Sequence, residues 1–276
     1  MKKTRKILAI VVTYFPEKEL LEKNISAFID YVDKVLIWEN TPEQEKLNYR
    51  FIEHEKVEYL GDGINSISHG LNYGWQYAKK HGYDYLLTMD QDSLFEDFRS
   101  YLQQTVYNPE APQGIWGPNA YNYDCNENSI IAHEYVITSG MLVSIGVLDS
   151  VGGWNESFDI DCVDDEFCLH AKSCGIKSYI IGQCILNQRY GAPCTSSFMG
   201  RRIQLRNDSP RRLKSIYKSH ISLMRMFPNS QTVKEDWRYW RWLIKWIFLL
   251  EHNRFKKMYA IMSGITLGLI CKIRKR

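Results

Sequence analysis

One continuous apolar segment near the start of the chain constrains the fold most. Residues 7–14 read Ile-Leu-Ala-Ile-Val-Val-Thr-Tyr and contain no charged side chain. A strand of this β-branched and aliphatic composition is typical of a parallel sheet that is covered on both faces. Because parallel strands need crossover connections, often helices, the segment predicts an α/β protein.

The segments that follow alternate between strand-like and helix-like patterns. Short apolar runs predict further strands at residues 35–38, 57–60, 83–89 and 135–143, the last of them broken at Gly140. Apolar residues recur at helical spacing in residues 17–31, 66–81 and 164–174. This alternation predicts a doubly wound α/β layer with helices on both faces of the sheet.

The composition is that of a folded protein whose last third differs from the rest. A hydrophobic content of 45% and a charged content of 24% argue against extensive disorder. The net charge of +3 is mild, but the excess of Arg and Lys lies after about residue 200, where Trp is also frequent. We therefore expect two domains, residues 1–200 and a basic, Trp-rich helical region at residues 201–276.

The cysteines and the first residues bear on the compartment. Seven cysteines occur without a C-x-x-C pair, which argues against a disulfide framework and against a zinc knuckle. We expect reduced thiols in a cytoplasmic protein. The charged residues 1–6 before the apolar segment imitate a signal peptide, but the segment is short and Phe15-Pro16 interrupts it. A buried first strand is the better interpretation.

Three of the predicted strands end in polar or acidic residues. Thr13 and Tyr14 end the first strand, Glu39 and Asn40 follow the second, and Asp90-Gln91-Asp92 follows the fourth. Ligands bind beyond the carboxyl ends of parallel strands, so we expect these side chains at one crevice. Two carboxylates at the spacing of Asp90 and Asp92 suit Mg²⁺ or Mn²⁺ that also binds a diphosphate.

An acidic cluster lies farther along the chain, at Asp159, Asp161, Asp164, Asp165 and Glu166. Apolar residues interleave with these acids, which indicates a segment packed against the core with some carboxylates at a cleft; a solvated acidic loop is the alternative. A carboxylate at a cleft can serve as a general base. The histidines are interpreted as structural, because His69, His133 and His170 lack the spacing of metal ligands.

Six short strings share their order and spacing with one enzyme family. They are Val11-Val12-Thr13-Tyr14, Glu39-Asn40, Asn72-x-Gly74, Leu87-Thr88-Met89-Asp90-Gln91-Asp92-Ser93, Thr138-Ser139-Gly140 and Ile160-Asp161-x-Val163-Asp164-x-Glu166-Phe167-Cys168-Leu169. In them the chain resembles the family 2 inverting glycosyltransferases of GT-A fold, and within these the rhamnosyltransferase-like branch. The resemblance covers about residues 7–192. It implies a Rossmann-like, mostly parallel sheet flanked by helices, with a C-terminal helical extension.

The resemblance also implies roles for individual residues. Those that bind the nucleotide sugar would be Thr13, Tyr14, Glu39, Asn40, Asp90, Gln91, Ser139 and Gly140. Asp90 and Asp92 would hold Mn²⁺ or Mg²⁺, and Gln188 is a further candidate ligand. Asp164 would be the catalytic base with Glu166 as its acidic neighbour in acceptor binding, while Trp154 and Asp161 are candidates for acceptor contacts.

Some positions depart from the family pattern. Glu39 stands where an Asp is usual, and His170 replaces a frequent Arg. Gln188-x-x-Gly191 stands where relatives commonly have His-x-x-Gly. Because Gln is a poorer metal ligand than His, we expect weaker metal binding, or binding by Asp92 and phosphate alone.

These observations predict an inverting, metal-dependent glycosyltransferase of cell-surface polysaccharide synthesis. The donor would be a nucleoside diphosphate sugar such as dTDP-rhamnose, and the acceptor a hydroxyl of a glycan or a lipid-linked saccharide. A UDP-hexose donor and a non-catalytic sugar-nucleotide or glycan-binding module remain as alternatives. A glycoside hydrolase is disfavoured because its two-carboxylate chemistry needs no D-x-D at a strand end, and no nucleic acid is expected as a partner.

The basic C-terminal region suggests contact with an anionic membrane. Residues 237–246 place Arg238, Arg241 and Lys245 on one helical stripe beside an aromatic face, a pattern typical of helices that lie in the headgroup region. The apolar run at residues 258–271 is shorter than the about 20 residues that span a bilayer. We expect peripheral association at the inner face of the cell membrane, with helices packed onto the catalytic domain as the alternative.

Overall fold

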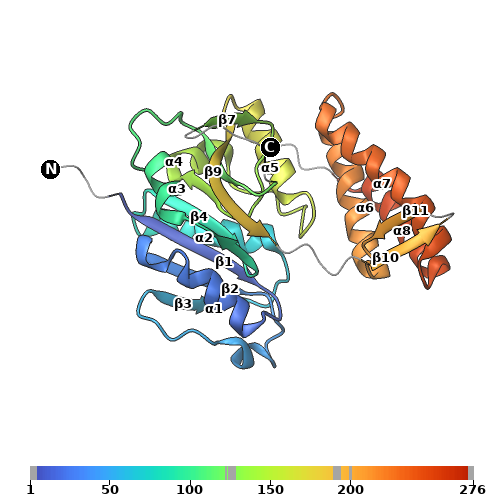
Figure 1. The fold of residues 1–276 in the computed structure, drawn as a ribbon, viewed down its shortest axis with the longest axis horizontal. Coiled ribbons are helices and arrows are strands. Elements are labelled where there is room, and N and C mark those ends of the chain that lie inside the picture. Colours follow the sequence, from blue (N-terminus) through green and yellow to red (C-terminus); the bar gives the residue numbers. More distant parts are fainter. Residues whose placement is uncertain (1–4, 122, 124–128, 189–193, 199–200, 273–276) are drawn as a thin grey trace. The chain divides into compact units, whose positions relative to one another are not determined.

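The computed structural model of the chain describes residues 5–121, 123, 129–188, 194–198 and 201–272 (Figure 1). The chain divides into two compact units. The first comprises Met1–Asp159 and Val163–Arg189, and the second comprises Ile160–Cys162 and Tyr190–Arg276. The division falls at residues 189/190, whereas the composition placed the boundary at residues 200/201.

A mixed sheet forms the centre of the first unit. Four neighbouring strands of this sheet are parallel, and in spatial order they are β3 (Val57–Leu60), β2 (Lys34–Glu39), β1 (Ile7–Thr13) and β4 (Tyr85–Asp90). The sheet continues through β8 (Met141–Ser144), β6 (Ile115–Asn119), β9 (Ser178–Gln188) and β5 (Ser93–Phe95), while β7 (Ile130–His133) pairs with β9. β8 is antiparallel to β4 and β6, and β9 is parallel to β6. The predicted α/β class with its parallel layer is confirmed.

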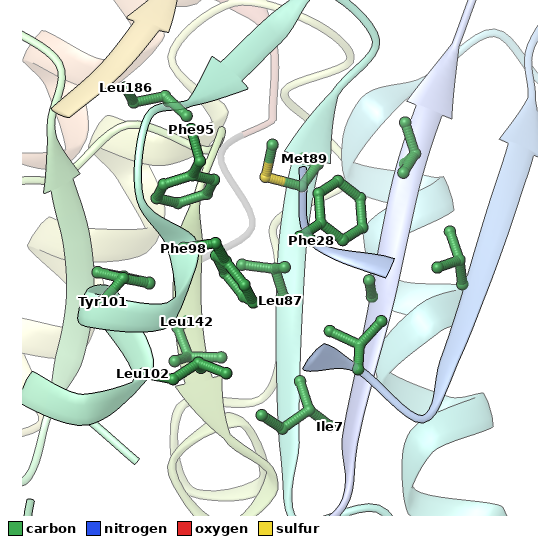
Figure 2. Packing of buried hydrophobic residues seen from close by; sticks show 14 of the residues in the cluster. Ile7, Phe28, Leu87, Met89, Phe95, Phe98, Tyr101, Leu102, Leu142 and Leu186 are labelled. Carbon is green, nitrogen blue, oxygen red and sulfur yellow. The ribbon is translucent and has the colours of Figure 1, made fainter. Parts of the chain in front are cut away.

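Helices cover both faces of this sheet, as the fully buried β1 predicts. On one face, α1 (Lys18–Ser26), η1 (Ile29–Tyr31) and α3 (Phe98–Gln104) accompany a cluster in which Phe28 and Phe98 pack near Leu87 and Met89 (Figure 2). On the other face, α2 (Ile67–Lys80) lies close to β1, because a Cβ on Gly74 would come within 2.6 Å of Ile10 Cδ1. The remaining helices of the unit are η2 (Lys46–Tyr49), α4 (Ile145–Val151) and α5 (Val163–Ser173).

Two predicted elements differ from the structure. The expected helix at residues 17–31 divides into α1 and η1. The expected strand at residues 135–143 is confined to Met141–Ser144, because the chain turns at Gly140 with a φ of +80°. The Gly140 amide donates to the Thr88 carbonyl (2.7 Å), and the Thr88 hydroxyl donates to the Thr138 carbonyl. The turn therefore lies against β4, close to the end of that strand.

The second unit contains a hairpin and helices. β10 (Cys194–Phe198) and β11 (Arg201–Leu205) are antiparallel, and α6 (Pro210–Met226), α7 (Gln231–Leu250) and α8 (Arg254–Ile270) follow. Tyr217 and Trp240 belong to its core cluster, and Tyr217 donates a hydrogen bond to the Trp240 carbonyl (2.8 Å). The predicted helical extension is confirmed, with a hairpin that the composition did not indicate. Within the described residues, no helix combines the length and the apolarity needed to cross a bilayer.

Candidate active site

The carboxyl ends of β1, β2 and β4 lie side by side, as predicted. Thr13 is in register with Glu39 on β2, and Val12 is in register with Asp90 on β4. The Asn40 amide donates to the Thr13 carbonyl (2.8 Å), which continues the pairing past the end of β2. The polar residues of three strand ends therefore meet at one edge of the sheet.

Gln91 attaches the turn after β1 to the end of β4. Its Oε1 accepts a hydrogen bond from the Tyr14 amide (2.7 Å), and its Nε2 donates to the Tyr14 carbonyl (3.3 Å). Tyr14 itself is 45% exposed, and its ring lies edge-on to that of Phe15, with 4.6 Å between the ring centroids. Gln91 thus supports the turn, and the Tyr14 ring is accessible for stacking.

Glu39 is buried and forms an ion pair with the side chain of Arg50. The Arg50 guanidinium donates to both of its carboxylate oxygens, from Nη2 (2.9 Å) and from Nε (3.2 Å). A bidentate pair of this kind fixes the orientation of both side chains. The sequence pattern did not single out Arg50, because it lies in a loop with no motif of its own.

Three carboxylates converge at the end of β4. Burial, together with the negative charges of Asp92 and Asp164, raises the pKa of Asp90 to about 7. A hydrogen bond from Gln188 Nε2 to Asp90 Oδ2 (3.3 Å) opposes this rise. The predicted base is distant in sequence from Asp90, yet it lies close enough to raise the pKa of Asp90. The two residues form hydrogen bonds with adjacent residues of one turn, Asp90 with Ser139 and Asp164 with Thr138.

Asp164 lies in the first turn of α5, which begins at Val163, one residue before the predicted start. Burial raises the pKa of its carboxyl group. Its Oδ1 accepts from the Asp165 amide (3.1 Å) and its Oδ2 from the Thr138 amide (3.4 Å). These donors and the helix N-terminus favour the ionised form, while burial increases its basicity.

Two amide oxygens near these carboxylates are buried without a hydrogen-bond partner, namely Asn24 Oδ1 and Gln188 Oε1. Asn24 Nδ2 donates to the Asp90 carbonyl (2.5 Å), and both amides line a pocket of about 170 Å³ together with Asp92. An unpartnered buried oxygen is costly unless a ligand satisfies it. Asn24 was missed from the sequence, although a polar residue on the apolar face of a predicted helix was a usable signal.

The side-chain oxygens of Asp90, Asp92 and Gln188 suit a hard divalent cation. Mg²⁺ and Mn²⁺ are bound by oxygen atoms, and sites for substrate phosphates need only one or two protein carboxylates. Among the described residues, no three His, Cys, Asp or Glu side chains form a complete metal site. Asp90, Asp92 and Gln188 would therefore require phosphate oxygens or water to complete the coordination.

Ser139 and Gly140 lie beside Asp90. The Asp90 amide donates to Ser139 Oγ (3.1 Å), and Ser139 is fully buried. A Cβ on Gly140 would come within 2.6 Å of Pro118 Cγ, so the turn has no space for a larger residue. These contacts determine the path of the backbone next to the carboxylates.

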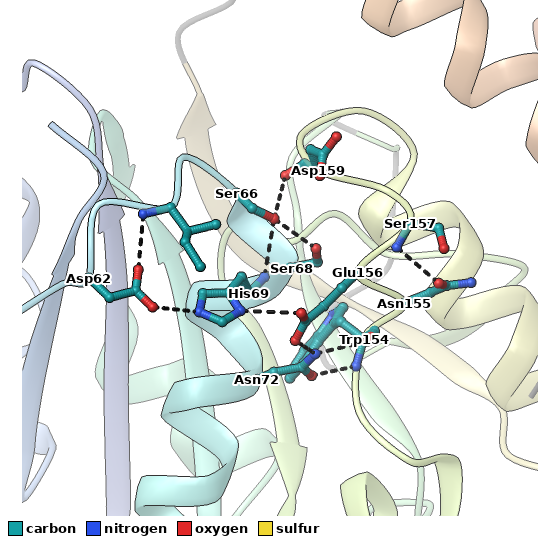
Figure 3. A network of polar contacts seen from close by, with 11 residues as sticks. Asp62, Ser66, Ser68, His69, Asn72, Trp154, Asn155, Glu156, Ser157 and Asp159 are labelled. Atoms are coloured by element: carbon teal, nitrogen blue, oxygen red, sulfur yellow. Dashed lines mark hydrogen bonds and ion pairs between the residues drawn. The ribbon is translucent and has the colours of Figure 1, made fainter. Parts of the chain in front are cut away.

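A polar network connects the loop before α5 to α2 (Figure 3). Asn72 donates from Nδ2 to the Trp154 carbonyl (2.9 Å) and to Glu156 (2.8 Å), and its Oδ1 accepts from the Trp154 amide (2.8 Å). His69 lies between Asp62 (2.8 Å) and Glu156 (3.2 Å). The interpretation of His69 as structural agrees with these contacts.

Trp154, which belongs to this loop, and Glu166, which belongs to α5, are both buried. The Trp154 ring stacks on Phe167, with 4.6 Å between the centroids, and Glu166 Oε1 accepts a hydrogen bond from Asn155 Nδ2 (3.0 Å). Neither side chain lies on an open surface, so the expected acceptor contacts of Trp154 and Glu166 gain no support from their burial and stay a prediction. Both residues are better suited to supporting the start of α5.

Asp161 belongs to the second unit and is paired there. Its Oδ1 lies 2.8 Å from Arg212 Nη2, and its Oδ2 accepts from the Ser215 hydroxyl (3.1 Å). Burial raises the pKa of this carboxyl group, although Arg212 and Ser215 lower it. An acceptor hydroxyl would compete with both partners, so the expected acceptor role of Asp161 gains no support from its contacts. Gly191, the end of the Gln-x-x-Gly string, lies outside the described residues.

The fold is that of a GT-A glycosyltransferase. It is similar to the crystal structure of GalNAc-T7 with UDP, GalNAc and Mn²⁺, with a TM-score of 0.59 and 9% sequence identity over 82% of this chain and 48% of that chain. The sequence is rhamnosyltransferase-like: it is 29% identical over 198 residues to dTDP-rhamnosyl transferase RfbF of Shigella flexneri, across 63% of this chain and 66% of that protein. No family model matches. The chain thus spans just under two thirds of the curated relative and about half of the structural neighbour.

Proposed function

We propose that this protein is an inverting glycosyltransferase that moves a sugar from a nucleoside diphosphate to an acceptor hydroxyl. The observation that carries the proposal is the meeting of Asp90, Asp92 and Asp164 near the end of β4: Asp90 and Asp164 form hydrogen bonds with the adjacent residues Ser139 and Thr138, and Asp92 lines a pocket with Gln188, which donates a hydrogen bond to Asp90. Two carboxylates there suit a metal diphosphate, and the third, at a helix start, suits a general base. The similarity to a rhamnosyltransferase supports this function independently.

The donor would bind across the carboxyl ends of β1, β2 and β4. We assign the nucleoside to Thr13, Tyr14, Glu39 and Asn40, with the exposed Tyr14 ring as a stacking surface for the base. Ser139 and Gly140 would border the sugar beside Asp90. We propose dTDP-rhamnose as the donor, because the curated relative is described as a dTDP-rhamnosyl transferase.

The diphosphate requires positive charge. Mn²⁺ or Mg²⁺ bound by Asp90, Asp92 and Gln188 would supply it and stabilise the charge that develops on the departing phosphate oxygen. The raised pKa of Asp90 supports a site of this kind, since carboxylates crowded in a buried place are stabilised by a cation.

Transfer would proceed by direct displacement at the anomeric carbon. Asp164 accepts the proton of the acceptor hydroxyl while that oxygen attacks the anomeric carbon from the face opposite the diphosphate. The new carbon–oxygen bond forms as the bond to the phosphate oxygen breaks, so the anomeric configuration inverts. Trp154, Asn155 and Glu166 would act by holding the start of α5 and not by touching the acceptor.

A donor screen tests the proposal. The full-length protein is incubated with dTDP-rhamnose, UDP-galactose, UDP-glucose or a UDP-N-acetylhexosamine, with Mn²⁺ or with chelator, and released nucleoside diphosphate is measured. We expect metal-dependent release from dTDP-rhamnose that increases with a polysaccharide or lipid-linked acceptor. Tight donor binding without release or transfer would instead favour the non-catalytic binding module.

A further inference from the structure

The outward face of α8 is apolar and exposed. Phe255, Tyr259, Met262, Leu269 and Ile270 are each between 55% and 77% exposed. At about 100° per residue all five fall on one face of the helix, while Gly264 and Gly268 on the opposite side pack against the backbone of α6. Five large apolar side chains on one helix face form a patch that isolated exposed residues do not.

The outward face of α7 adjoins this patch and combines aromatic with basic residues. Arg238, Trp242, Lys245 and Leu249 are exposed and recur at helical spacing. The two helices meet at Phe248 and Phe255, whose ring centroids are 6.3 Å apart. The Arg254 guanidinium lies over both rings, at 5.8 and 5.5 Å. We call the exposed residues of α7 and α8 together the aromatic–basic surface.

From residue 237 onward the exposed charge on this surface has one sign, whereas the first turns of α7 also carry the exposed Glu235. Residues 237–272 contain seven Lys or Arg residues and a single acidic residue, Glu251. Glu251 is buried and paired with Lys257, at 2.6 Å. The other basic side chains are all exposed, and they are Arg238, Arg241, Lys245, Arg254, Lys256 and Lys272. No acidic side chain is therefore exposed in this stretch of the chain.

We propose that the aromatic–basic surface binds an anionic lipid bilayer, with α8 inserted to the depth of its apolar side chains. Exposed Phe, Met and Leu side chains gain from entering the acyl boundary, Trp and Tyr suit the headgroup region, and the flanking cations attract anionic lipids. This inference goes beyond the proposed transfer reaction and does not depend on it.

The charge of the aromatic–basic surface favours an anionic bilayer over a second copy of the chain as its binding partner. A symmetric pair through the same surface would bring the exposed cations of both copies together, which is unfavourable. A bilayer that contains phosphatidylglycerol offers the opposite charge and an apolar layer beneath it. The observed combination of side chains therefore favours the bilayer.

Flotation of the full-length protein with vesicles tests the proposal. We expect it to float with vesicles of phosphatidylcholine and phosphatidylglycerol, and to remain at the bottom with phosphatidylcholine alone. A triple variant, Phe255→Ser, Tyr259→Ser and Met262→Ser, should bind at least about tenfold more weakly, because it removes the inserted side chains. Arg241→Glu with Lys245→Glu should also lower binding by roughly tenfold or more.

The matched control is Leu47→Ser with Tyr107→Ser, which removes exposed apolar residues from the first unit and should leave binding unchanged. Circular dichroism and the thermal midpoint of the triple variant should match those of the unchanged protein. Wild-type protein that stays at the bottom with anionic vesicles, or a triple variant that floats equally well, would overturn the proposal. So would a dimer, measured by light scattering, that the triple variant converts to a monomer without any vesicle binding.

Discussion

Asp164 and Glu166 lie two positions apart in the first turn of α5, yet their surroundings differ. Residues two apart on a helix point about 200° away from each other, so one can face the site while the other faces the core. Asp164 lies close enough to Asp90 to raise the pKa of that residue, whereas Glu166 is buried and accepts a hydrogen bond from Asn155. This difference supports Asp164 as the base.

Replacing Asp164 by Asn should separate donor binding from transfer. The change removes the proton acceptor at almost constant size, so donor affinity should persist and the rate of transfer should fall by on the order of a hundredfold or more. Single-turnover transfer and donor titration measure the two quantities. The comparison variant is Glu166→Gln, which should lower the thermal midpoint and leave the transfer rate close to that of the unchanged protein. A nearly unchanged rate in Asp164→Asn together with an inactive Glu166→Gln would reverse the two roles.

Replacing Asp92 by Ala should remove metal-dependent donor binding. Asp92 follows the end of β4 and lines the pocket with Gln188, so its loss should weaken the metal site and leave the strand intact. Calorimetry with nucleoside diphosphate and Mn²⁺ should show at least a tenfold weaker affinity, roughly 1.4 kcal/mol. The exposed Glu53→Gln serves as a control with unchanged affinity. Turnover that is insensitive to excess chelator would argue against the metal assignment.

The helices of the second unit depend on close backbone contact. A Cβ on Gly264 would come within 2.5 Å of the Lys214 carbonyl, and one on Gly268 within 2.7 Å of the Lys218 carbonyl. In an isolated helix, Gly→Ala is stabilising by about 1 kcal/mol. Here the added methyl group would force α8 away from α6.

We therefore expect Gly264→Ala to destabilise the protein, by roughly 1–3 kcal/mol in urea unfolding, as overpacking does. Ser263→Ala, at the neighbouring and partly exposed position, provides the matched control and should be close to neutral. A gain in stability for Gly264→Ala would mean that α6 and α8 are not packed as closely as the structure indicates.

Elements with a strong pattern were predicted, and elements that depend on their neighbours were not. The uninterrupted apolar run of β1 and the spacing of α2 are local signals, and both elements form as expected. Strand β9, with 11 residues, was not predicted, because its Gly and polar residues dilute the pattern. It forms because β6, β7 and β5 supply hydrogen-bond partners from other parts of the chain.

The pH dependence of stability is a property of the whole molecule, and His220 should contribute to it. The ring lies 5.0 Å from that of Trp240, and burial, followed by the charge of Arg206, lowers the pKa of His220 to about 3. In the unfolded chain this pKa is about 6.5. Between these values the unfolded state binds a proton that the folded state does not. The contribution of His220 is therefore complete above about pH 6.5 and is lost as the pH falls towards 3.

His220→Phe should weaken this dependence. Urea midpoints between pH 4 and 7 should fall less steeply in the variant than in the unchanged protein, since the titrating group is absent. The exposed His252→Gln in the same unit is the control and should retain the original slope. Equal slopes in all three proteins would show that folding does not lower the pKa of His220.

At the scale of the whole chain, the sequence alone determined the α/β class, the helical extension and which residues meet at the strand ends. Those features rest on local signals: strand and helix periodicity, and the rule that parallel strands share a carboxyl edge. The strings around Thr13, Asp90 and Asp164 carried the family resemblance, and Asp90 and Asp164 form hydrogen bonds with the adjacent residues Ser139 and Thr138.

Only the tertiary structure decided how the remaining site residues are used. The Trp154 ring is stacked on Phe167, and Glu166 is bonded to Asn155. Asp161 is paired with Arg212, and Glu39 is paired with Arg50. Each of these contacts joins residues that are at least 11 positions apart and lie in different segments, so no local pattern records them. A polar side chain can bind a ligand only if no other group of the protein occupies its hydrogen-bonding atoms. Tertiary packing decides which groups come within hydrogen-bond distance, so this is settled only when the chain has folded.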